Sequence, residues 1–180
     1  SRIRAQFLRS QYDCLITTSK TVNTDNPILD CRIEGLEHKS PDIFIIDRFL
    51  KLKKNLKIEK KSRNRKIHII TLYKNKKIIS SHMKKKYKFL FFKNIFSKND
   101  FKKVFKIIKT KGYNRIFVES GLIFLNFMIS NKFVNNVYIF KTDKPLKRQG
   151  KNNTNASILK KLDTKDKKVN VNLLSDDLFK

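Results

Sequence analysis

The stretch NDFKKVFKIIKTKGYNRIFVESGLIFLNFMISNK, residues 99–132, places two helix patterns around one strand pattern. In its first part apolar side chains recur at helical spacing, Asn99 or Asp100 offers an N-cap, and Gly112 offers a C-terminal stop. The apolar run RIFVE then predicts a buried strand, and a second helix is expected from Ser120. A helix, a strand and a helix in this order indicate the crossover units of a parallel sheet.

The same alternation continues on both sides of this stretch. Apolar runs predict strands at Cys14–Thr17, Ile43–Asp47, Ile67–Thr71, Lys88–Phe92 and Asn136–Thr142, and an alternating run predicts an edge strand at Val169–Leu174. Helices are expected at Arg2–Gln11 and Ser157–Leu162. We therefore expect one α/β domain over residues 1–180, with three layers, α/β/α, and a mostly parallel central sheet.

The composition is typical of a folded, soluble chain. A length of 180 residues suits one domain with one core, and 39% hydrophobic residues with 15 Phe exclude a disordered polymer. No apolar run approaches the ~20 residues that span a bilayer, and the N-terminus lacks the pattern of a signal peptide. We therefore expect a cytoplasmic protein that does not associate with a membrane.

The formal charge of +28, from 43 Lys and Arg against 15 Asp and Glu, admits two explanations. Such a field attracts polyanions, so the chain could be a basic nucleic-acid-binding module. Alternatively, a compositional bias fills solvent-facing positions with lysine, since alanine occurs only at Ala5 and Ala156 and glycine only 4 times. Because the cations are spread over nearly the whole chain, we favour the second explanation and expect no specific nucleic-acid partner.

Cysteine and histidine form no recognisable metal or disulfide pattern. Cys14 and Cys31 lack the spacing of metal-binding pairs, and two thiols in a chain of this size indicate a reducing compartment. His38, His68 and His82 lie far apart along the sequence. We therefore expect no metal site.

Ligands of a parallel α/β sheet bind at the carboxyl ends of its strands, and two such ends carry polar groups. After the strand RIFVE, Glu119, Ser120 and Gly121 stand at the expected start of a helix, where free amides can meet a phosphate at close range. The same residues also fit an ordinary strand-to-helix turn in which Glu119 is the cap. Both interpretations are open at this point.

The second polar end is the segment from Thr18 to Arg32. It shows no periodicity, and its proline disfavours a helical conformation in the preceding residue, so an ordered loop is expected. Thr21 and Asp25 could hold ribose or amide groups. Arg32, and Arg9 before the strand, offer planar forks suited to a phosphate. Alternatively, Asp25 caps the turn at the proline and Arg32 is one more exposed cation.

The residues LRSQYDCLITTSKTVNTDNPILDCR (8–32) resemble the reductase domain of the bifunctional riboflavin biosynthesis protein RibD, a dihydrofolate-reductase-like family. The shared pattern is L-R, a spacer, D, an apolar strand, a small-residue turn ending in T, and D-[DN]-P-x-L-x-x-R, without a gap. The block RIFVESGLIFLNFMISNKFVNNVYIF is similar to the family's strand, E-G-G turn, helix and following strand. PDIFIIDRFLKL lies between them, where the family has a strand ending in D. The resemblance covers most of the region from Arg2 to about Gly150.

The resemblance implies a dihydrofolate-reductase-like fold, NADPH as hydride donor, and reduction of 5-amino-6-(5-phosphoribosylamino)uracil to its ribitylamino product in riboflavin biosynthesis. It implies substrate-binding roles for Arg9, Leu29, Arg32 and Glu119, and cofactor-binding roles for Thr21, Asp25, Gly121, Leu122, Ile123, Phe124, Leu125, Asn126 and Phe127. In such a site the cofactor carries the hydride and the protein orients it, so we assign no catalytic nucleophile or general base. A homodimer is compatible with the resemblance.

The chain departs from the family pattern at several positions. Ser120 and Thr18 replace glycines, Arg48 replaces a small polar residue, and Asn135 and Asn136 replace an Asp-Glu pair. The family's first strand, with its A-x-S-x-D-G pattern, is missing, as are the zinc-binding motifs of a deaminase. We therefore expect an N-terminally truncated reductase domain, with the first strand and any deaminase domain upstream. A catalytically degenerate reductase-like domain is the other alternative.

Overall fold

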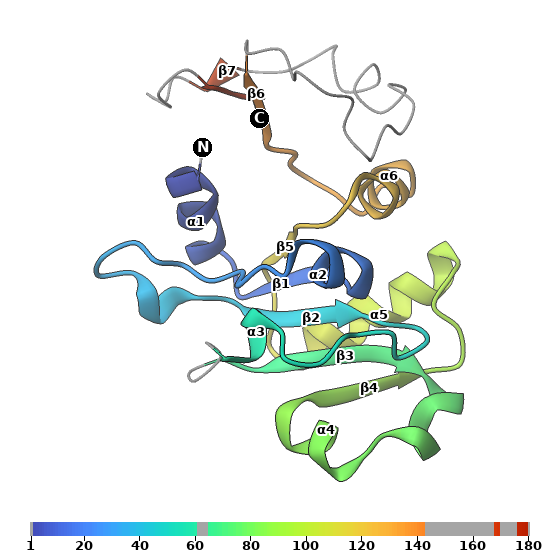
Figure 1. The fold of residues 1–180 in the computed structure, drawn as a ribbon. Coiled ribbons are helices and arrows are strands. Elements are labelled where there is room, and N and C mark those ends of the chain that lie inside the picture. Colours follow the sequence, from blue (N-terminus) through green and yellow to red (C-terminus); the bar gives the residue numbers. More distant parts are fainter. Residues whose placement is uncertain (1, 61–64, 143–167, 170–175, 180) are drawn as a thin grey trace. The chain divides into compact units, whose positions relative to one another are not determined.

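The computed structural model describes residues 2–60, 65–142, 168–169 and 176–179. These residues form two compact units, one of residues 6–120 and one of the remaining described residues. The larger unit contains a parallel sheet, and the smaller unit contains helix α6 and an antiparallel sheet (Figure 1).

The sheet of the larger unit has five strands, all parallel, in the order β4-β3-β2-β1-β5. They are β1 (Cys14–Thr18), β2 (Asp42–Ile46), β3 (Ile67–Leu72), β4 (Lys88–Phe92) and β5 (Ile116–Val118). The five strands predicted for this unit are confirmed to within one residue at each end, whereas the strand predicted at Asn136–Thr142 begins only at Ile139 and belongs to an antiparallel sheet of the smaller unit. They were recognisable because the chain buries both faces of this sheet, so each strand is a continuous apolar run.

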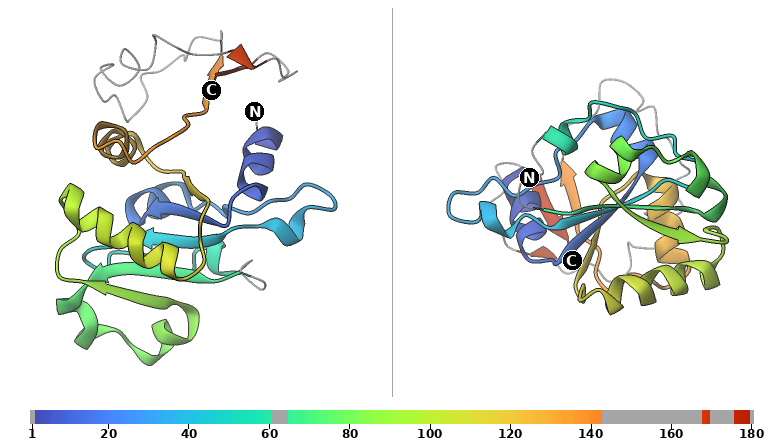
Figure 2. Two further views of the ribbon diagram at one scale, coloured as in Figure 1. Left: turned by 180° about the vertical axis from the view of Figure 1, so that it is seen from behind. Right: turned by 90° about the horizontal axis from the view of Figure 1, so that it is seen from below.

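Helices cover both faces of this sheet, which confirms the predicted three-layer α/β architecture (Figure 2). One face carries α2 (Ser19–Asp25), α3 (Lys57–Lys60) and α4 (Ser81–Lys86), and the other carries α5 (Lys98–Thr110). On the first face, Val22 of α2 and Ile58 of α3 pack with strand residues such as Leu15. The unit also contains most of α1 (Arg2–Ser10) and the short helices η1 (Glu37–Lys39) and η2 (Tyr73–Ile78).

Helix α5 begins earlier than predicted. Its N-cap is Ser97, not Asn99 or Asp100, because Ser97 Oγ accepts the Asp100 N–H (3.2 Å) and the Asp100 carboxylate accepts the Ser97 N–H (2.9 Å). This reciprocal arrangement satisfies two backbone donors, and the hydrogen bonds from Ser97 lower the pKa of Asp100. The predicted stop is confirmed, since Gly112 follows the helix with a φ of +92°.

The segment from Thr18 to Arg32 was predicted as a loop, which is wrong for Ser19–Asp25, where α2 forms, and confirmed for residues 26–32, which form no helix or strand. Thr18 caps α2 by accepting the Thr21 N–H at its Oγ1 (3.3 Å). The helix ends at Asn26, which takes a φ of +43° and donates its N–H to the Val22 oxygen (3.0 Å). Pro27 therefore ends the helix without preventing it, because a proline restricts only the residue directly before it.

The smaller unit contains α6 (Leu122–Ser130), β6 (Ile139–Thr142), β7 (Lys168–Val169) and β8 (Asp176–Phe179). Its strands form an antiparallel sheet in the order β6-β8-β7. The helix predicted from Ser120 begins at Leu122, with Gly121 as its N-cap. Of the edge strand predicted at Val169–Leu174, only the first residue is described, in β7, and the helix predicted at Ser157–Leu162 lies outside the described residues.

Both cysteines are buried free thiols. Burial, with the nearby Asp13 and Asp42 carboxylates, raises the pKa of Cys14 to about 12, so this thiol stays protonated at neutral pH. Over the described ranges, no group of histidine, cysteine and acidic side chains could hold a metal ion. In the same ranges no helix is long and apolar enough to cross a bilayer.

His68 of β3 is buried in a cluster of aromatic rings. Its ring stacks on Phe44 with centroids 4.3 Å apart, and Tyr113 meets both rings edge-on. The Tyr113 hydroxyl donates to Asp42 Oδ2 (2.6 Å), which leaves it only an acceptor toward His68 Nε2 (3.4 Å). Burial lowers the pKa of His68 to about 4 and outweighs the opposing effect of the Asp42 carboxylate.

We expect this histidine to make the fold sensitive to mild acid. A histidine in the unfolded chain has a pKa of about 6.5, so protonation favours the unfolded state. The stability that comes from the neutral ring is complete above that value and is lost as the pH falls toward 4. The free energy of unfolding should therefore fall by about 2 kcal/mol between pH 7 and pH 5 through His68.

Urea unfolding of the wild type and of His68→Phe at both pH values measures this effect. The variant keeps a ring to stack on Phe44 but cannot titrate, so its unfolding free energy should fall less over the same interval. An equal pH dependence in the two proteins would show that His68 is not held neutral.

Candidate active site

Three hydroxyl groups meet at the carboxyl ends of β1 and β5. Thr18 Oγ1 lies 3.0 Å from Thr21 Oγ1 and 3.2 Å from Ser120 Oγ, and the last two atoms lie 3.0 Å apart. The residues come together because β1 and β5 are neighbours in the sheet and α2 begins directly after β1. This hydroxyl cluster joins the two polar segments that the sequence predicts at separate strand ends.

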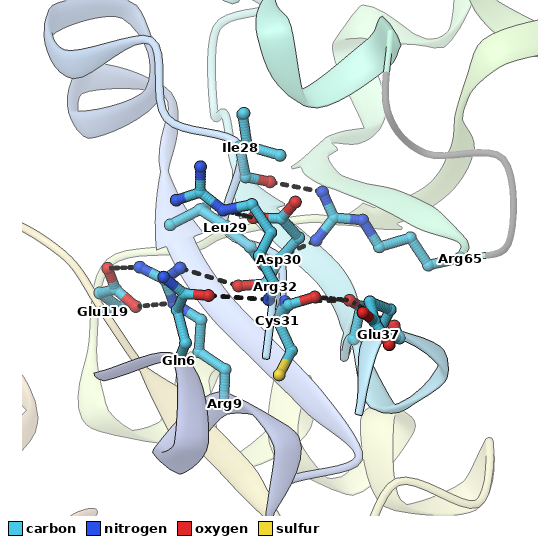
Figure 3. Close-up of polar contacts among 11 residues, drawn as sticks. Gln6, Arg9, Ile28, Leu29, Asp30, Cys31, Arg32, Glu37, Arg65 and Glu119 are labelled. Carbon is cyan, nitrogen blue, oxygen red and sulfur yellow. Dashed lines mark hydrogen bonds and ion pairs between the residues drawn. The ribbon is translucent and has the colours of Figure 1, made fainter. Parts of the chain in front are cut away.

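Glu119, the residue before Ser120, forms a bidentate ion pair with Arg9. Arg9 Nε lies 2.9 Å from Oε2 and Nη2 lies 2.7 Å from Oε1, while Nη1 donates to the backbone oxygen of Asp30 (3.0 Å), as Figure 3 shows. The Arg9 side chain is 13% exposed and that of Glu119 is 35% exposed. The fork therefore fixes the orientation of a carboxylate that solvent can still reach. Each Nη group keeps a second hydrogen that these bonds do not use.

A second arginine, Arg65, holds the backbone around Leu29. Its guanidinium donates to the carbonyl oxygens of Ile28 and of Leu29, the latter at 2.6 Å (Figure 3). Leu29 takes a φ of +57°, a left-handed conformation that costs a non-glycine residue about 1–2 kcal/mol. Burial lowers the pKa of Arg65, and the carbonyl bonds offset part of the cost of burying its charge. With Arg9 on the Asp30 oxygen, two arginines hold three successive carbonyl groups.

The predicted substrate residues Leu29 and Arg32 lie in different surroundings. The Leu29 side chain is 3% exposed and packs in the core, so only its backbone could face a ligand. Arg32 is exposed and pairs with the Asp30 carboxylate, with 3.2 Å between Nε and Oδ1. Its backbone N–H donates to Gln6 Oε1 (2.8 Å), which ties this segment to α1. Arg32 is therefore a positioned cation at the rim of the site.

Asp25 is the last residue of α2, and its side chain is exposed. Its carboxylate makes no hydrogen bond or ion pair with any residue that the structure describes. Asn26, not Asp25, organises the turn, since it closes the helix and accepts the Lys57 N–H at its Oδ1 (2.9 Å). The alternative that Asp25 is a structural cap is therefore wrong.

Asp47, the residue after β2, accepts hydrogen bonds from the backbone of the loop that follows it. Asp47 is 2% exposed, and its carboxylate accepts the N–H groups of Lys51 (2.9 Å) and Leu52 (2.8 Å). Both oxygens are thus engaged with backbone donors. Asp47 shapes the loop after β2 and is not available to hold a ribose.

The other predicted cofactor residues, Gly121 to Phe127, form the N-cap and the first part of α6 in the smaller unit. The hydrogen bonds within the helix begin with the N–H groups of Phe124 and Leu125, which donate to the Gly121 oxygen (3.1 and 3.2 Å). Side chains at this start are apolar, and Ile123 is 68% exposed. What these residues offer a polar ligand is therefore the backbone of a helix start.

Sequence reasoning missed Asp30 and Arg65 as parts of the site and gave no role to the Thr18 hydroxyl. Asp30 lies between two predicted site residues, Leu29 and Arg32, which is a signal that could have been used. Arg65 had no such signal, because it is one of 43 cations and follows a lysine-rich stretch.

A protein-family model and several solved structures match this chain. The family model described as the RibD C-terminal domain matches residues 1–144. No curated protein matches the chain.

Solved structures of riboflavin biosynthesis proteins resemble the fold of this chain. One is the Thermotoga maritima diaminohydroxyphosphoribosylaminopyrimidine deaminase/5-amino-6-(5-phosphoribosylamino)uracil reductase, with a TM-score of 0.70 and 18% identity over 99% of this chain and 47% of that chain. Acinetobacter baumannii RibD gives 0.73, with 14% identity over 99% of this chain and 48% of that one. The Saccharomyces cerevisiae riboflavin biosynthesis reductase Rib7 gives 0.72, with 22% identity over 99% and 78%. The chain thus spans about half the length of the two bacterial proteins, and at these identities the likeness concerns the fold.

Proposed function

Because the chain belongs to the RibD C-terminal domain family, we propose that it reduces 5-amino-6-(5-phosphoribosylamino)uracil to the ribitylamino product with NADPH. The reaction adds a hydride to the ribosyl carbon and takes up one proton, and NADP⁺ leaves. When bound, the nicotinamide supplies the hydride. The residues of the chain bind both partners and set the distance and angle between them.

One observation carries this proposal: the 3.0 Å contact between the hydroxyls of Thr21 and Ser120. It connects the segment after β1, which bears the predicted cofactor residues, to the strand end that bears Glu119. A reductase needs its cofactor and its substrate at one place, and this contact brings the two sequence blocks to the same edge of the sheet. Neither block alone would support a hydride transfer.

The groups present fit a dinucleotide and a phosphorylated sugar. The hydroxyl cluster and the exposed Asp25 carboxylate can accept hydrogen bonds from ribose hydroxyls or a carboxamide. Taken by itself, the helix start of α6 offers backbone N–H groups of the kind that bind a pyrophosphate. Arg32 and the unused hydrogens of Arg9 suit the substrate phosphate. In this arrangement Glu119 faces the reacting part of the substrate and Arg9 orients it.

The direct test is an assay of NADPH oxidation by the chain, with and without the pyrimidine substrate. Oxidation that depends on the substrate and yields the ribitylamino product supports the proposal. NADPH binding without any turnover would instead identify a degenerate reductase. Absence of both binding and turnover would refute the function.

Asp25→Ala tests the cofactor part of the site on its own. We expect NADPH to bind about tenfold more weakly, since one hydrogen bond from a ligand to a charged group is lost. The unfolding free energy should stay within about 0.5 kcal/mol of the wild type, because the side chain is exposed and has no partner in the described chain. Calorimetric titration and urea unfolding measure both quantities. Glu34→Ala removes the same charge from another exposed position and should change neither.

A further inference from the structure

Two successive carbonyl groups in the segment after α2 turn toward one guanidinium. Arg65 Nη1 donates to the Leu29 oxygen (2.6 Å), and Nη2 donates to the Ile28 oxygen (Figure 3). In an extended strand, successive carbonyl groups alternate in direction. Here Leu29 takes a left-handed conformation, with a φ of +57°, and both carbonyl groups reach the same side of the segment. Arg65 therefore holds a backbone shape that the residue at position 29 does not favour by itself.

The N–H groups of the same two peptide units point away from Arg65. No peptide bond in the described segments is cis, and in a trans peptide unit the N–H points opposite to the C=O. The N–H of Leu29 shares its peptide unit with the Ile28 oxygen, and the N–H of Asp30 shares its unit with the Leu29 oxygen. Both donors therefore face the side of the segment that is opposite to the guanidinium.

Neither of these two N–H groups has a hydrogen-bond partner among the residues that the structure describes. The next peptide unit differs, because Arg9 donates to its Asp30 oxygen (3.0 Å) and its Cys31 N–H donates to Ser40 Oγ (3.0 Å). Leu29 is 3% exposed, and a backbone N–H that is covered to this degree is almost always paired in a native protein. The N–H groups of Leu29 and Asp30 are therefore donors that can serve a ligand.

The two donors belong to the segment that carries predicted substrate residues. The Leu29 side chain packs in the core, so the backbone is the only part of this residue that can act on a substrate. Arg32 lies two residues further and pairs with the Asp30 carboxylate (3.2 Å). The proposed substrate carries acceptor oxygens on its uracil ring, its ribose and its phosphate. Backbone N–H groups bind such oxygens and add no charge to the site.

We propose that Arg65 is a positioning residue for the substrate: by holding the Ile28 and Leu29 carbonyl groups, it keeps the N–H groups of Leu29 and Asp30 directed at acceptor oxygens of the pyrimidine substrate. This inference rests on the proposed function. Arg65 acts through the backbone and does not touch the substrate, because both of its Nη groups bind carbonyl oxygens on the far side of the segment. Its positive charge also polarises the two peptide units, which makes their N–H groups better donors.

The first test is Arg65→Lys, which keeps the charge but replaces the planar fork with a single ammonium group. We expect the KM for the pyrimidine substrate to rise about tenfold, because two hydrogen bonds to the substrate are weakened, and the KM for NADPH to stay within about twofold. Calorimetric titration with the substrate in the absence of NADPH should show the same tenfold loss of affinity. Lys66→Gln is the matched control, because it removes the neighbouring exposed cation, and it should change none of these values.

Two further measurements separate positioning from a general loss of stability. Val104→Ala removes fully buried side-chain volume in α5, on the other face of the sheet, and should lower the free energy of unfolding without raising the KM for the substrate. In the wild type, the amide NMR signals of Leu29 and Asp30 should shift when the substrate binds. The Cys31 signal should shift less, because its N–H already donates to Ser40.

Several outcomes would overturn the inference. Wild-type substrate affinity in Arg65→Lys, or amide signals of Leu29 and Asp30 that do not respond to the substrate, would show that these donors do not serve it. An equal loss of affinity in Lys66→Gln would indicate net charge alone, and an equal loss in Val104→Ala would indicate stability alone. If substrate binding depends on Arg65 but no substrate-dependent NADPH oxidation occurs, the inference stands and the proposed reductase function fails.

Discussion

Glu119→Gln is expected to lower kcat/KM for the proposed reduction by about 100-fold or more. The variant has almost the same shape, but its neutral amide offers one acceptor oxygen where the carboxylate offers two to the Arg9 fork. Arg9 is largely covered, so its charge would lose its partner in a poorly solvated place, at a cost of about 3 kcal/mol. The orientation of both side chains toward the substrate would be lost together.

Steady-state kinetics of this variant must be read beside its stability. Urea unfolding shows whether a fall in kcat/KM comes from a destabilised fold or from the site. Glu59→Gln is the matched control, because Glu59 forms an ion pair of similar length with Lys86 (2.9 Å) in another part of the larger unit. It should retain kcat/KM within about twofold. Full activity of Glu119→Gln would mean that this carboxylate neither contacts nor orients the substrate.

Asp47→Ala should destabilise the chain by about 3 kcal/mol. The substitution leaves the N–H groups of Lys51 and Leu52 without their acceptor in a place where the replaced side chain was 2% exposed. Hydrogen bonds to a charged group contribute about 1.5–3 kcal/mol each, and water can restore only part of this.

Asp47→Asn separates shape from charge at this position. Its amide nitrogen would face one of the two backbone donors, so we expect a loss close to that of Asp47→Ala, although the side chain has the same size. The measurement is urea unfolding of the three proteins followed by far-ultraviolet circular dichroism. A free energy of unfolding within 1 kcal/mol of the wild type in Asp47→Ala would show that the loop amides find other acceptors.

The strands were predictable because a strand that is buried on both faces has apolar side chains at nearly every position. KFLFF predicts β4 at Lys88–Phe92 without error, since each of its positions is apolar except the first. The sequence of helix α2 shows no comparable apolar pattern. It buries one residue fully, Val22, and it forms because Thr18 and Asn26 close its two ends, so its stability comes from caps and neighbours.

The candidate site could be predicted only as far as parallel strands impose it. Polar groups at carboxyl ends must share an edge, and on that basis Thr21 and Glu119 were expected in one site. No local sequence pattern determines the order of strands in a sheet. The position of β1 between β2 and β5 is therefore known only from the structure. The partners of Arg9 and Arg65 were also not predictable, because nothing in the sequence distinguishes these two arginines from the rest of the 43 cations.

The position of β5 beside β1 has a consequence for how the protein is made. Glu119 is synthesised 110 residues after Arg9, which at roughly 5–20 residues per second is an interval on the order of ten seconds. Once β2 (Asp42–Ile46) has been made and has paired, β1 has β2 on one side and, until β5 follows, an unpaired backbone edge on the other, open to any extended segment nearby. A nascent chain therefore passes through a stage that is prone to wrong pairing, and a chaperone that shields this edge would act before the ribosome reaches Ser120.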